Sequence, residues 1–122
     1  MYNYGKATED YLEAILILQN KNSNVKAIDL ANYFEYKRST ISVAVKNMKA
    51  AKLITVDESH YIILTQKGLN IAKKTYEKHM FFKNMLLEAG VHPNIAEDTA
   101  CRMEHDISDT SFNLLKKMKY HF

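Results

Sequence analysis

The chain has 122 residues, enough for one modest domain or two very small ones, and 47% of them are hydrophobic, enough for a core. Its 17 Lys and Arg residues against 14 Asp and Glu give a net charge of only +3, so charge alone does not indicate a nucleic-acid-binding protein. A single cysteine excludes an internal disulfide, and no apolar run approaches the roughly 20 residues that cross a membrane. We expect a cytoplasmic protein without a signal peptide or a membrane span.

The first half of the chain predicts three helices and a hairpin. Apolar residues recur at helical spacing in three segments, which we expect to be helices: 8–21, 27–35 and 38–52. Thr8 is the predicted N-cap of the first. Two β-branched runs at 54–56 and 61–64 flank a polar segment and predict a two-stranded hairpin. This order of elements is typical of a winged helix-turn-helix domain.

The second half predicts a long helix followed by a shorter one. A periodic segment indicates a helix from about Thr65 to Glu88, because Gly90 and Pro93 then interrupt the pattern. Pro93 suits the first turn of the next helix, which we place at about 93–106.

A last short helix closes the chain. Ser108 or Asp109 suits its N-cap, and it is expected to end near Lys119. The predicted fold is mainly α, with a winged helix-turn-helix DNA-binding domain at 1–72 and a helical metal-binding and dimerisation domain at 73–122.

The third predicted helix and its flanks carry only positive charge, from Lys37, Arg38, Lys46, Lys49 and Lys52. With Ile41, Val45 and Met48 turned to the core, the open face of this helix carries Ser39, Thr40, Ser42, Val43 and Lys46. Such a face suits a recognition helix that meets base edges and phosphates, although a basic helix that is merely solvated is the alternative. The candidate DNA-binding residues are Lys37, Arg38, Ser39, Thr40, Ser42, Lys46 and Lys49.

The tip of the predicted hairpin is acidic. Asp57 and Glu58 would repel phosphate, which leaves His60 and Tyr61 as the better candidates for DNA contact there. The sequence therefore does not establish whether the hairpin contacts DNA.

The stretch TACRMEHDIS at 99–108 contains the one cysteine of the chain. Cys101, Glu104 and His105 follow one another at i, i+3 and i+4, so a helix places all three on one face. Thiolate, carboxylate and imidazole are all ligands of divalent metals. A small buried cysteine beside an exposed Glu-His pair explains the same residues without a metal.

Two other places supply ligand types. Asp10 and Glu13 form an i, i+3 carboxylate pair at the start of the first helix, where the helix dipole also favours acids. His79 lies where a basic stretch turns apolar, a position that a histidine satisfied within the core would also fit. Neither place indicates a metal site by itself.

The combination resembles the DtxR/MntR family of metal-dependent transcriptional repressors. The resemblance covers about residues 6–109 and rests on the winged helix-turn-helix together with TEDYLEAI at 8–15, LTQKG at 64–68, KH at 78–79 and ACRMEH at 100–105. It implies that a divalent Mn or Fe ion bridges the two domains and that a homodimer binds a palindromic operator in double-stranded DNA. The ligand positions that it implies are Asp10, Glu13, His79, Cys101, Glu104 and His105.

The resemblance also implies how these ligands are shared. In the arrangement of the manganese branch, one ion would be held by Asp10, Glu13, His79 and Glu104. The second ion would be held by Cys101 and His105, with Glu13 and Glu104 as bridges.

The chain combines features of both branches of the family. Cys101 is typical of the iron branch, whereas Asp10 stands where that branch has methionine, and its ancillary site would fall at Lys83 and Glu97, which cannot reproduce it. Carboxylates and imidazoles suit Mn(II) or Fe(II), and a thiolate favours Fe(II), Co(II) or Zn(II). We expect Mn(II) ahead of Fe(II), with Zn(II) or Co(II) binding in vitro.

The function expected from the resemblance is repression of metal-uptake genes, not catalysis. The chain ends before the SH3-like domain of longer family members, so dimerisation would depend on the helices after about residue 70, through Phe81, Phe82, Met85, Leu86 and Leu87. A winged-helix regulator that has lost metal dependence is the alternative. A metal-dependent hydrolase would need an open coordination position in a substrate cleft and would leave the basic helix unexplained, so no small-molecule substrate is expected.

Overall fold

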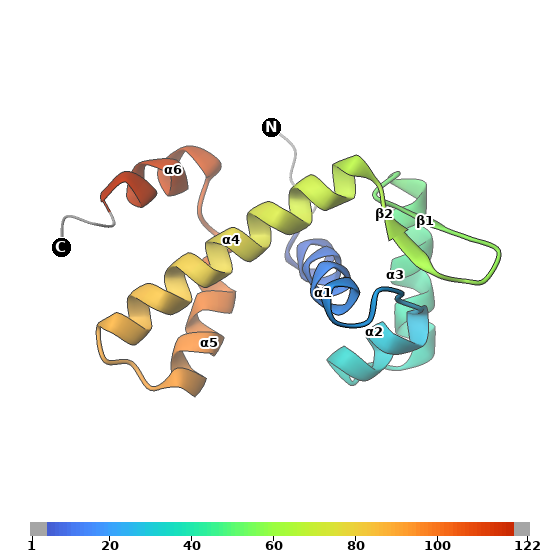
Figure 1. The fold of residues 1–122 in the computed structure, drawn as a ribbon, viewed down its shortest axis with the longest axis horizontal. Helices are drawn as coiled ribbons and strands as arrows, with labels where there is room; N and C mark the ends of the chain where they lie inside the picture. The colour runs from blue at the N-terminus through green and yellow to red at the C-terminus, as the bar shows by residue number, and fades with distance from the viewer. Residues whose placement is uncertain (1–4, 119–122) are drawn as a thin grey trace. The chain divides into compact units, whose positions relative to one another are not determined.

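The computed structural model describes residues 5–118, and this part of the chain forms six helices and one hairpin (Figure 1). It divides into two compact units, of which the first ends at Lys74 and the second begins at Thr75. The predicted mainly α fold is confirmed, and the sequence-based boundary after residue 72 falls in the same helix as this division. None of the described helices is long and apolar enough to cross a membrane.

The first unit begins with three helices, close to the predicted bounds: α1 Lys6–Asn22, α2 Ala27–Phe34 and α3 Arg38–Ala50. α2 begins where the carboxylate of Asp29 accepts a hydrogen bond from the backbone N–H of Lys26 at 2.8 Å. It ends at Phe34, and the left-handed backbone of the next residue, Glu35, turns the chain toward α3. The two helices therefore meet in a tight turn, as helix-turn-helix motifs require.

The prediction that Thr8 caps α1 is wrong. Gly5 has a φ of 85°, and its carbonyl accepts a hydrogen bond from the backbone N–H of Glu9 at 3.2 Å. Because this first helical bond forms before Thr8, Thr8 lies inside the first turn.

The hairpin pairs β1 Ile54–Val56 with β2 Ile62–Leu64 in an antiparallel register that sets Val56 opposite Ile62. The backbone N–H of Ile62 also donates to the carbonyl of Val25 at 2.7 Å, so the segment after α1 adjoins β2. Both strands bury their first residue in the core of this unit.

The acidic hairpin tip has a structural reason. The side chain of Asp57 accepts hydrogen bonds at 2.9 Å from the backbone N–H groups of both Ser59 and Tyr61. Asp57 therefore stabilises the turn between the strands through hydrogen bonds within the chain.

Twelve buried apolar residues form the core of the first unit: Leu12, Ala14, Ile15, Val25, Leu30, Ala31, Ile41, Met48, Leu53, Ile54, Ile62 and Ala72. Ile41 and Met48 anchor α3 in this core, and Val45 packs against its edge. The predicted inner face of α3 is confirmed.

The long helix α4, Gln66–Glu88, begins against the hairpin. The hydroxyl of Thr65 donates to the carbonyl of Lys52 at 2.7 Å and accepts from the backbone N–H of Gly68 at 3.1 Å. A Cβ on Gly68 would lie 2.0 Å from the carbonyl oxygen of Leu53. Only glycine therefore fits at this contact.

The second unit packs the end of α4 with α5, Pro93–Met103, and α6, Asp109–Met118. Its core consists of Phe81, Phe82, Ala100 and Phe112. The ring of Phe81 meets those of Phe82 and Phe112 edge to face, with centroids 5.3 Å apart in each pair.

This core removes Phe81 and Phe82 from the predicted dimerisation surface. Phe81 and Phe82 are buried within the unit itself, and Met85 and Leu86 pack against them. Of the five residues expected to supply the surface, Leu87 is the one that stays exposed. The exposed large hydrophobic residues of this unit are Tyr76, Leu87, Ile95, Leu114, Leu115 and Met118.

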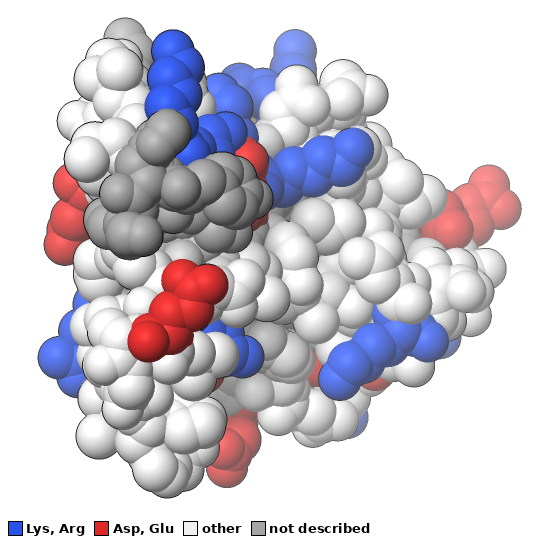
Figure 2. All heavy atoms as spheres, turned by 60° about the vertical axis from the view of Figure 1, so that its left-hand side comes forward, with Lys and Arg blue, Asp and Glu red and all other residues white. Residues whose placement is uncertain are grey.

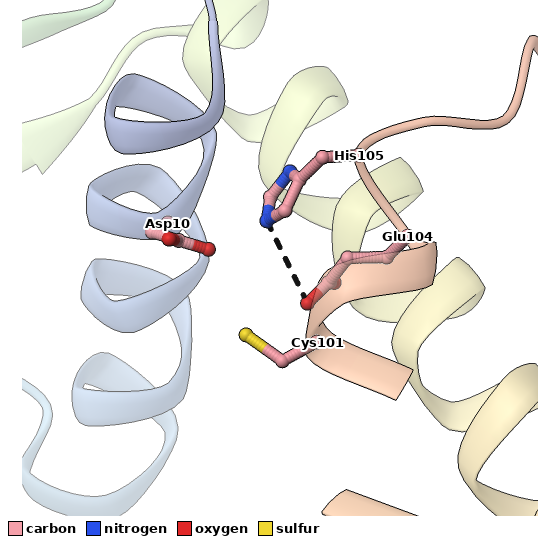
Figure 3. A group of neighbouring side chains, drawn as sticks. All are labelled: Asp10, Cys101, Glu104 and His105. Atoms are coloured by element: carbon pink, nitrogen blue, oxygen red, sulfur yellow. Dashed lines mark ion pairs between the residues drawn. The ribbon is translucent and has the colours of Figure 1, made fainter. Parts of the chain in front are cut away.

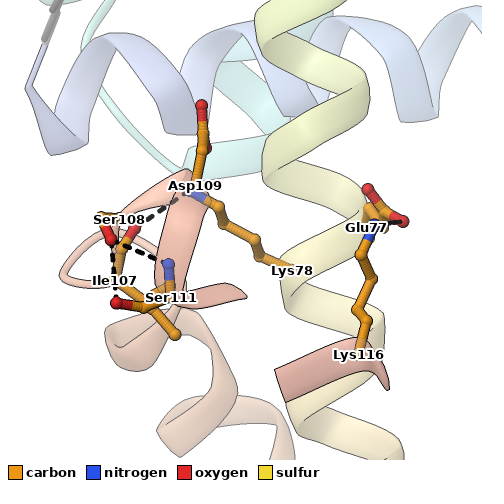
Figure 4. Close-up of polar contacts among 7 residues, drawn as sticks. All are labelled: Glu77, Lys78, Ile107, Ser108, Asp109, Ser111 and Lys116. Atoms are coloured by element: carbon orange, nitrogen blue, oxygen red, sulfur yellow. Dashed lines mark hydrogen bonds and ion pairs between the residues drawn. The ribbon is translucent and has the colours of Figure 1, made fainter. Parts of the chain in front are cut away.

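Polar contacts attach the α6 segment to α4 (Figure 4). The ammonium group of Lys78 lies 3.0 Å from the carboxylate of Asp109 and donates to the carbonyl of Ile107 at 3.1 Å. Further along α6, Lys116 pairs with Glu77 at 2.9 Å.

The N-terminus of α6 is capped by the first of the two predicted residues. The hydroxyl of Ser108 accepts from the backbone N–H of Ser111 at 3.1 Å (Figure 4). The predicted end of this helix, Lys119, lies outside the described residues.

We expect Gly68→Ala to lower the free energy of unfolding by about 1 to 3 kcal/mol or more, because its Cβ meets a backbone oxygen that cannot move away alone. Urea denaturation measures this change through the midpoint at constant slope. The control is Lys73→Ala, an exposed position on the same helix, which should shift stability by less than about 0.5 kcal/mol. Equal stability of Gly68→Ala and the wild type would contradict the close approach.

Candidate metal centre and DNA-binding face

The end of α5 positions three of the predicted ligands. The helix ends at Met103, earlier than the predicted residue 106. The backbone N–H of Glu104 still donates to the carbonyl of Ala100 at 3.0 Å, but that of Asp106 donates to Met103 at 3.2 Å, in the tighter i→i−3 pattern. The chain therefore leaves the helix between these two residues.

Cys101, Glu104 and His105 project to the same side of this turn (Figure 3). One ligand atom from each lies within 4.8 Å of the others. The Nε2 atom of His105 is 3.8 Å from Oε1 of Glu104. The structure thus brings together the thiol, carboxylate and imidazole whose spacing the sequence singled out.

The carboxylate of Glu104 is the most unusual group of this cluster. Its side chain is 0% exposed, and among the described residues its Oε2 atom has no hydrogen-bond partner. A buried carboxylate oxygen without a partner costs free energy, which a bound cation would recover. Together with the donor set, this unpaired oxygen fits a divalent metal ion.

His79 reaches the same carboxylate from α4. Its Nδ1 atom lies 3.3 Å from Oε1 of Glu104, the oxygen that also faces His105. Its Nε2 atom lies 2.5 Å from Oε2 of Glu97, whose other oxygen pairs with Lys83 at 2.9 Å. Glu104 is therefore a neighbour of both candidate imidazole ligands, His79 and His105.

Glu97 and Lys83 are the contacts that sequence reasoning missed. The family resemblance implies only that these two residues cannot form an ancillary site, yet they form an ion pair that touches His79. The sequence holds only part of the signal: Lys83 follows His79 at i+4, and Glu97 precedes Cys101 by four residues, so each shares a helical face with a candidate ligand. This spacing does not indicate that the two helices meet. Burial alone would raise the pKa of Glu97, but hydrogen bonds and charge from Lys83 and His79 hold this pKa below its usual value.

Asp10 and Glu13 belong to the first unit, on α1. They lie one helical turn apart, with Glu13 buried and Asp10 half-buried. Asp10, also drawn in Figure 3, is 3.7 Å from the ammonium group of Lys6. The first unit therefore offers two carboxylates on one face of a single helix.

The candidate DNA-binding residues of α3 form an exposed face. All seven are exposed, namely Lys37, Arg38, Ser39, Thr40, Ser42, Lys46 and Lys49, and Val43 beside them is 60% exposed. The turn at the hairpin tip adds exposed His60, whereas Tyr61 is half-buried beneath the ammonium group of Lys26 at 5.1 Å.

Charge on other parts of the surface is mixed. In the view of Figure 2, basic and acidic side chains are interspersed among neutral ones. The run from Lys37 to Lys52, which has five basic residues and no acidic one, therefore stands out as a stretch of one sign.

Comparison with known proteins identifies regulators similar to this chain. Residues 65–122 match the family model of the iron dependent repressor metal-binding and dimerisation domain. The uncharacterized HTH-type transcriptional regulator MJ0568 of Methanocaldococcus jannaschii is 33% identical over 113 residues, which cover 91% of this chain and 90% of that protein. The transcriptional regulator MntR of Escherichia coli O6:H1 is 28% identical over 108 residues, which cover 88% of this chain and 70% of MntR.

A solved structure has the same fold. The manganese regulator SloR superposes with a TM-score of 0.79 at 25% identity over 91% of this chain. The match covers 52% of the SloR chain, so the present chain spans about half the length of that protein.

We expect Co(II) to report directly on Cys101, because a bond between thiolate and Co(II) gives charge-transfer absorption in the near ultraviolet. The wild type should develop this band on titration, and Cys101→Ser should not. Met103→Leu, which removes a thioether from the same helix, is the control and should keep the band. A wild-type protein that binds Co(II) without the band would show that Cys101 is not a ligand.

Proposed function

The chain belongs to the DtxR/MntR family of metal-dependent transcriptional repressors, and from this premise we propose that it represses metal-uptake genes in the cytoplasm when a divalent ion is bound. The observation that carries the proposal is the buried, unpaired oxygen of Glu104 beside Cys101 and His105. A cluster of this kind suits an ion sensor better than a purely structural turn.

The proposed metal ligands are the four residues of the second unit and the two carboxylates of α1: His79, Cys101, Glu104, His105, Asp10 and Glu13. Glu104 supports a shared site, because its Oε1 atom faces His79 and His105 at once. We assign His79, Asp10 and Glu13 to one ion with Glu104. Cys101 and His105 would hold the second, to which Glu13 and Glu104 would also contribute.

The proposed metal is Mn(II), ahead of Fe(II). Three of the six ligands are carboxylates and two are imidazoles, a mainly hard set that suits Mn(II) and Fe(II). The thiolate of Cys101 pulls toward Fe(II), Co(II) or Zn(II), so discrimination depends on geometry and on the metals that the cell supplies. The solved structure of SloR is described as that of a manganese regulator, which favours the first choice.

The proposed switch is a shift between conformations of one chain. A bound ion supplies positive charge that the carboxylates of Asp10, Glu13 and Glu104 share. These side chains then hold α1 to the second unit and favour the DNA-competent state. A coupling of ~1 to 3 kcal/mol, or roughly 5- to 150-fold in operator affinity, is sufficient for such a switch.

The proposed DNA contact is the exposed face of α3. Ser39, Thr40 and Ser42 reach base edges, while the basic side chains around them bind phosphates: Lys37, Arg38, Lys46 and Lys49. The matched family model is a dimerisation domain, and a homodimer with two recognition helices would bind a palindromic operator.

We expect Asp10→Ala and His79→Ala to abolish the dependence of operator binding on metal while leaving the fold intact. Fluorescence anisotropy with a labelled promoter fragment, at fixed salt with Mn(II) or a chelator, measures the effect. Circular dichroism checks the fold.

The matched control is Asp98→Ala. This carboxylate on α5 pairs at the surface with Arg102 at 2.6 Å, and its loss should leave the metal response unchanged. Operator binding that still follows metal in both ligand variants would overturn the assignment. Wild-type binding that ignores chelator would favour a metal-independent winged-helix regulator.

We expect Lys46→Ala to weaken binding to every DNA sequence by a similar factor, because a phosphate contact carries no base information. The slope of log affinity against log salt should become shallower by about 0.9 for each phosphate that the variant no longer binds. Lys117→Ala, an exposed lysine of α6, is the control and should leave the slope unchanged. An unaltered slope in Lys46→Ala would remove this residue from the interface.

A further inference from the structure

Glu97 contacts two side chains of α4 through its two oxygens. Its Oε2 lies 2.5 Å from His79 Nε2, and its Oε1 lies 2.9 Å from the ammonium nitrogen of Lys83. The other nitrogen of the same imidazole, Nδ1, lies 3.3 Å from Oε1 of Glu104. Lys83, Glu97, His79 and Glu104 therefore form one continuous series of contacts, and all four belong to the second unit.

Exposure falls along this series toward the candidate metal site. The side chains of Glu97 and Lys83 are 51% and 30% exposed, whereas those of His79 and Glu104 are 11% and 0% exposed. An ion pair as open to water as the outer one adds little stability. Its contact with the buried imidazole therefore suggests a role in orienting that ring.

The helices fix the geometry of the series. Lys83 follows His79 by one turn on α4, so both side chains leave the same face of the helix. On α5, Glu97 precedes Cys101 by four residues and Glu104 by seven, so these three also share a face. The carboxylate that touches Nε2 thus comes from the same helical face as the carboxylate that faces Nδ1.

We propose that Glu97, held by Lys83, is the positioning residue of His79. By accepting a hydrogen bond from Nε2–H, Glu97 orients the ring so that Nδ1 faces Glu104. Histidines that bind metals usually donate their other ring N–H to a carboxylate, carbonyl or water in this way. The inference rests on the proposed function, since it adds a supporting residue to the proposed site.

The contact with Lys83 indicates whether Glu97 is a metal ligand or a residue that supports one. A carboxylate beside an imidazole could itself be a metal ligand, but the ammonium group at 2.9 Å already neutralises Glu97 and repels a second cation there. Glu97 therefore supports a ligand and is not one. Its two oxygens are divided between the lysine and the histidine.

The first test uses the metal-free protein. ¹⁵N NMR of the full chain, at a pH where the imidazole is neutral, reports which nitrogen of His79 carries the hydrogen. We expect Nε2–H in the wild type and in Glu97→Gln, whose amide oxygen still accepts a hydrogen bond, but a mixture of tautomers in Glu97→Leu. Nδ1–H in the wild type, or an unchanged tautomer in Glu97→Leu, would overturn the inference.

The second test measures Mn(II) affinity by competition with a chelating dye. Glu97→Leu should bind Mn(II) about 10- to 100-fold more weakly, and Glu97→Gln should lose less. The control is Asp98→Leu, which removes the neighbouring carboxylate and its surface pair with Arg102 and should change the affinity less than twofold. The same comparison with Co(II) would show whether the effect is general.

The two tests separate this inference from the function on which it rests. If the wild type binds Mn(II) and Glu97→Leu binds it equally well, the positioning role is wrong and the proposed metal site stands. If the wild type binds neither Mn(II), Fe(II) nor Co(II), the proposed function fails, and the positioning role fails with it even where the tautomer is as expected.

Discussion

The buried carboxylate of Glu104 is the constraint on which the arrangement of the second unit depends. One oxygen faces two imidazoles, and the other has no hydrogen-bond partner among the described residues. Desolvating such an oxygen opposes folding, so the aromatic packing around Phe81 and Phe82 must offset it. A buried polar group that lowers stability in this way is typical of a ligand-binding site, where the bound ligand supplies the missing partner.

In the first unit, three polar side chains form hydrogen bonds with nearby backbone groups. Asp29 caps α2, Asp57 folds the hairpin tip and Thr65 joins the start of α4 to the segment before β1. What these local bonds hold in place is the outward face of α3. The first unit thus presents an exposed basic helix, and the second contains the cluster of Cys101, Glu104 and His105.

The sequence predicts the elements well where periodicity reports burial directly. Ile41 and Met48 mark the inner face of α3, and the clustering of Cys101 and Glu104 follows from helical spacing. That clustering persists although α5 ends early, because the N–H of Glu104 still makes a helical bond. Periodicity does not reveal which partner covers an apolar face, so the inward packing of Phe81 could not be predicted.

Two further misses have different causes. The start of α1 depends on the backbone angle of Gly5, which composition does not encode, and this angle places Thr8 inside the helix. The role of Glu97 depends on a contact between two helices distant in sequence. In the sequence, Lys83 and Glu97 are indistinguishable from exposed surface charges. Only the structure shows that the ring of His79 lies beside them.

α6 carries no candidate ligand, but its Phe112 covers apolar surface of the second unit that would otherwise face water. Its ring contacts Phe81 and Phe82, with centroids 5.3 Å and 6.1 Å apart. A recombinant fragment cut between His105 and α6 would keep His79, Cys101, Glu104 and His105 but would expose two aromatic rings to water. Such a fragment would self-associate through a surface that the longer chain covers, so a usable isolated second unit has to extend through α6.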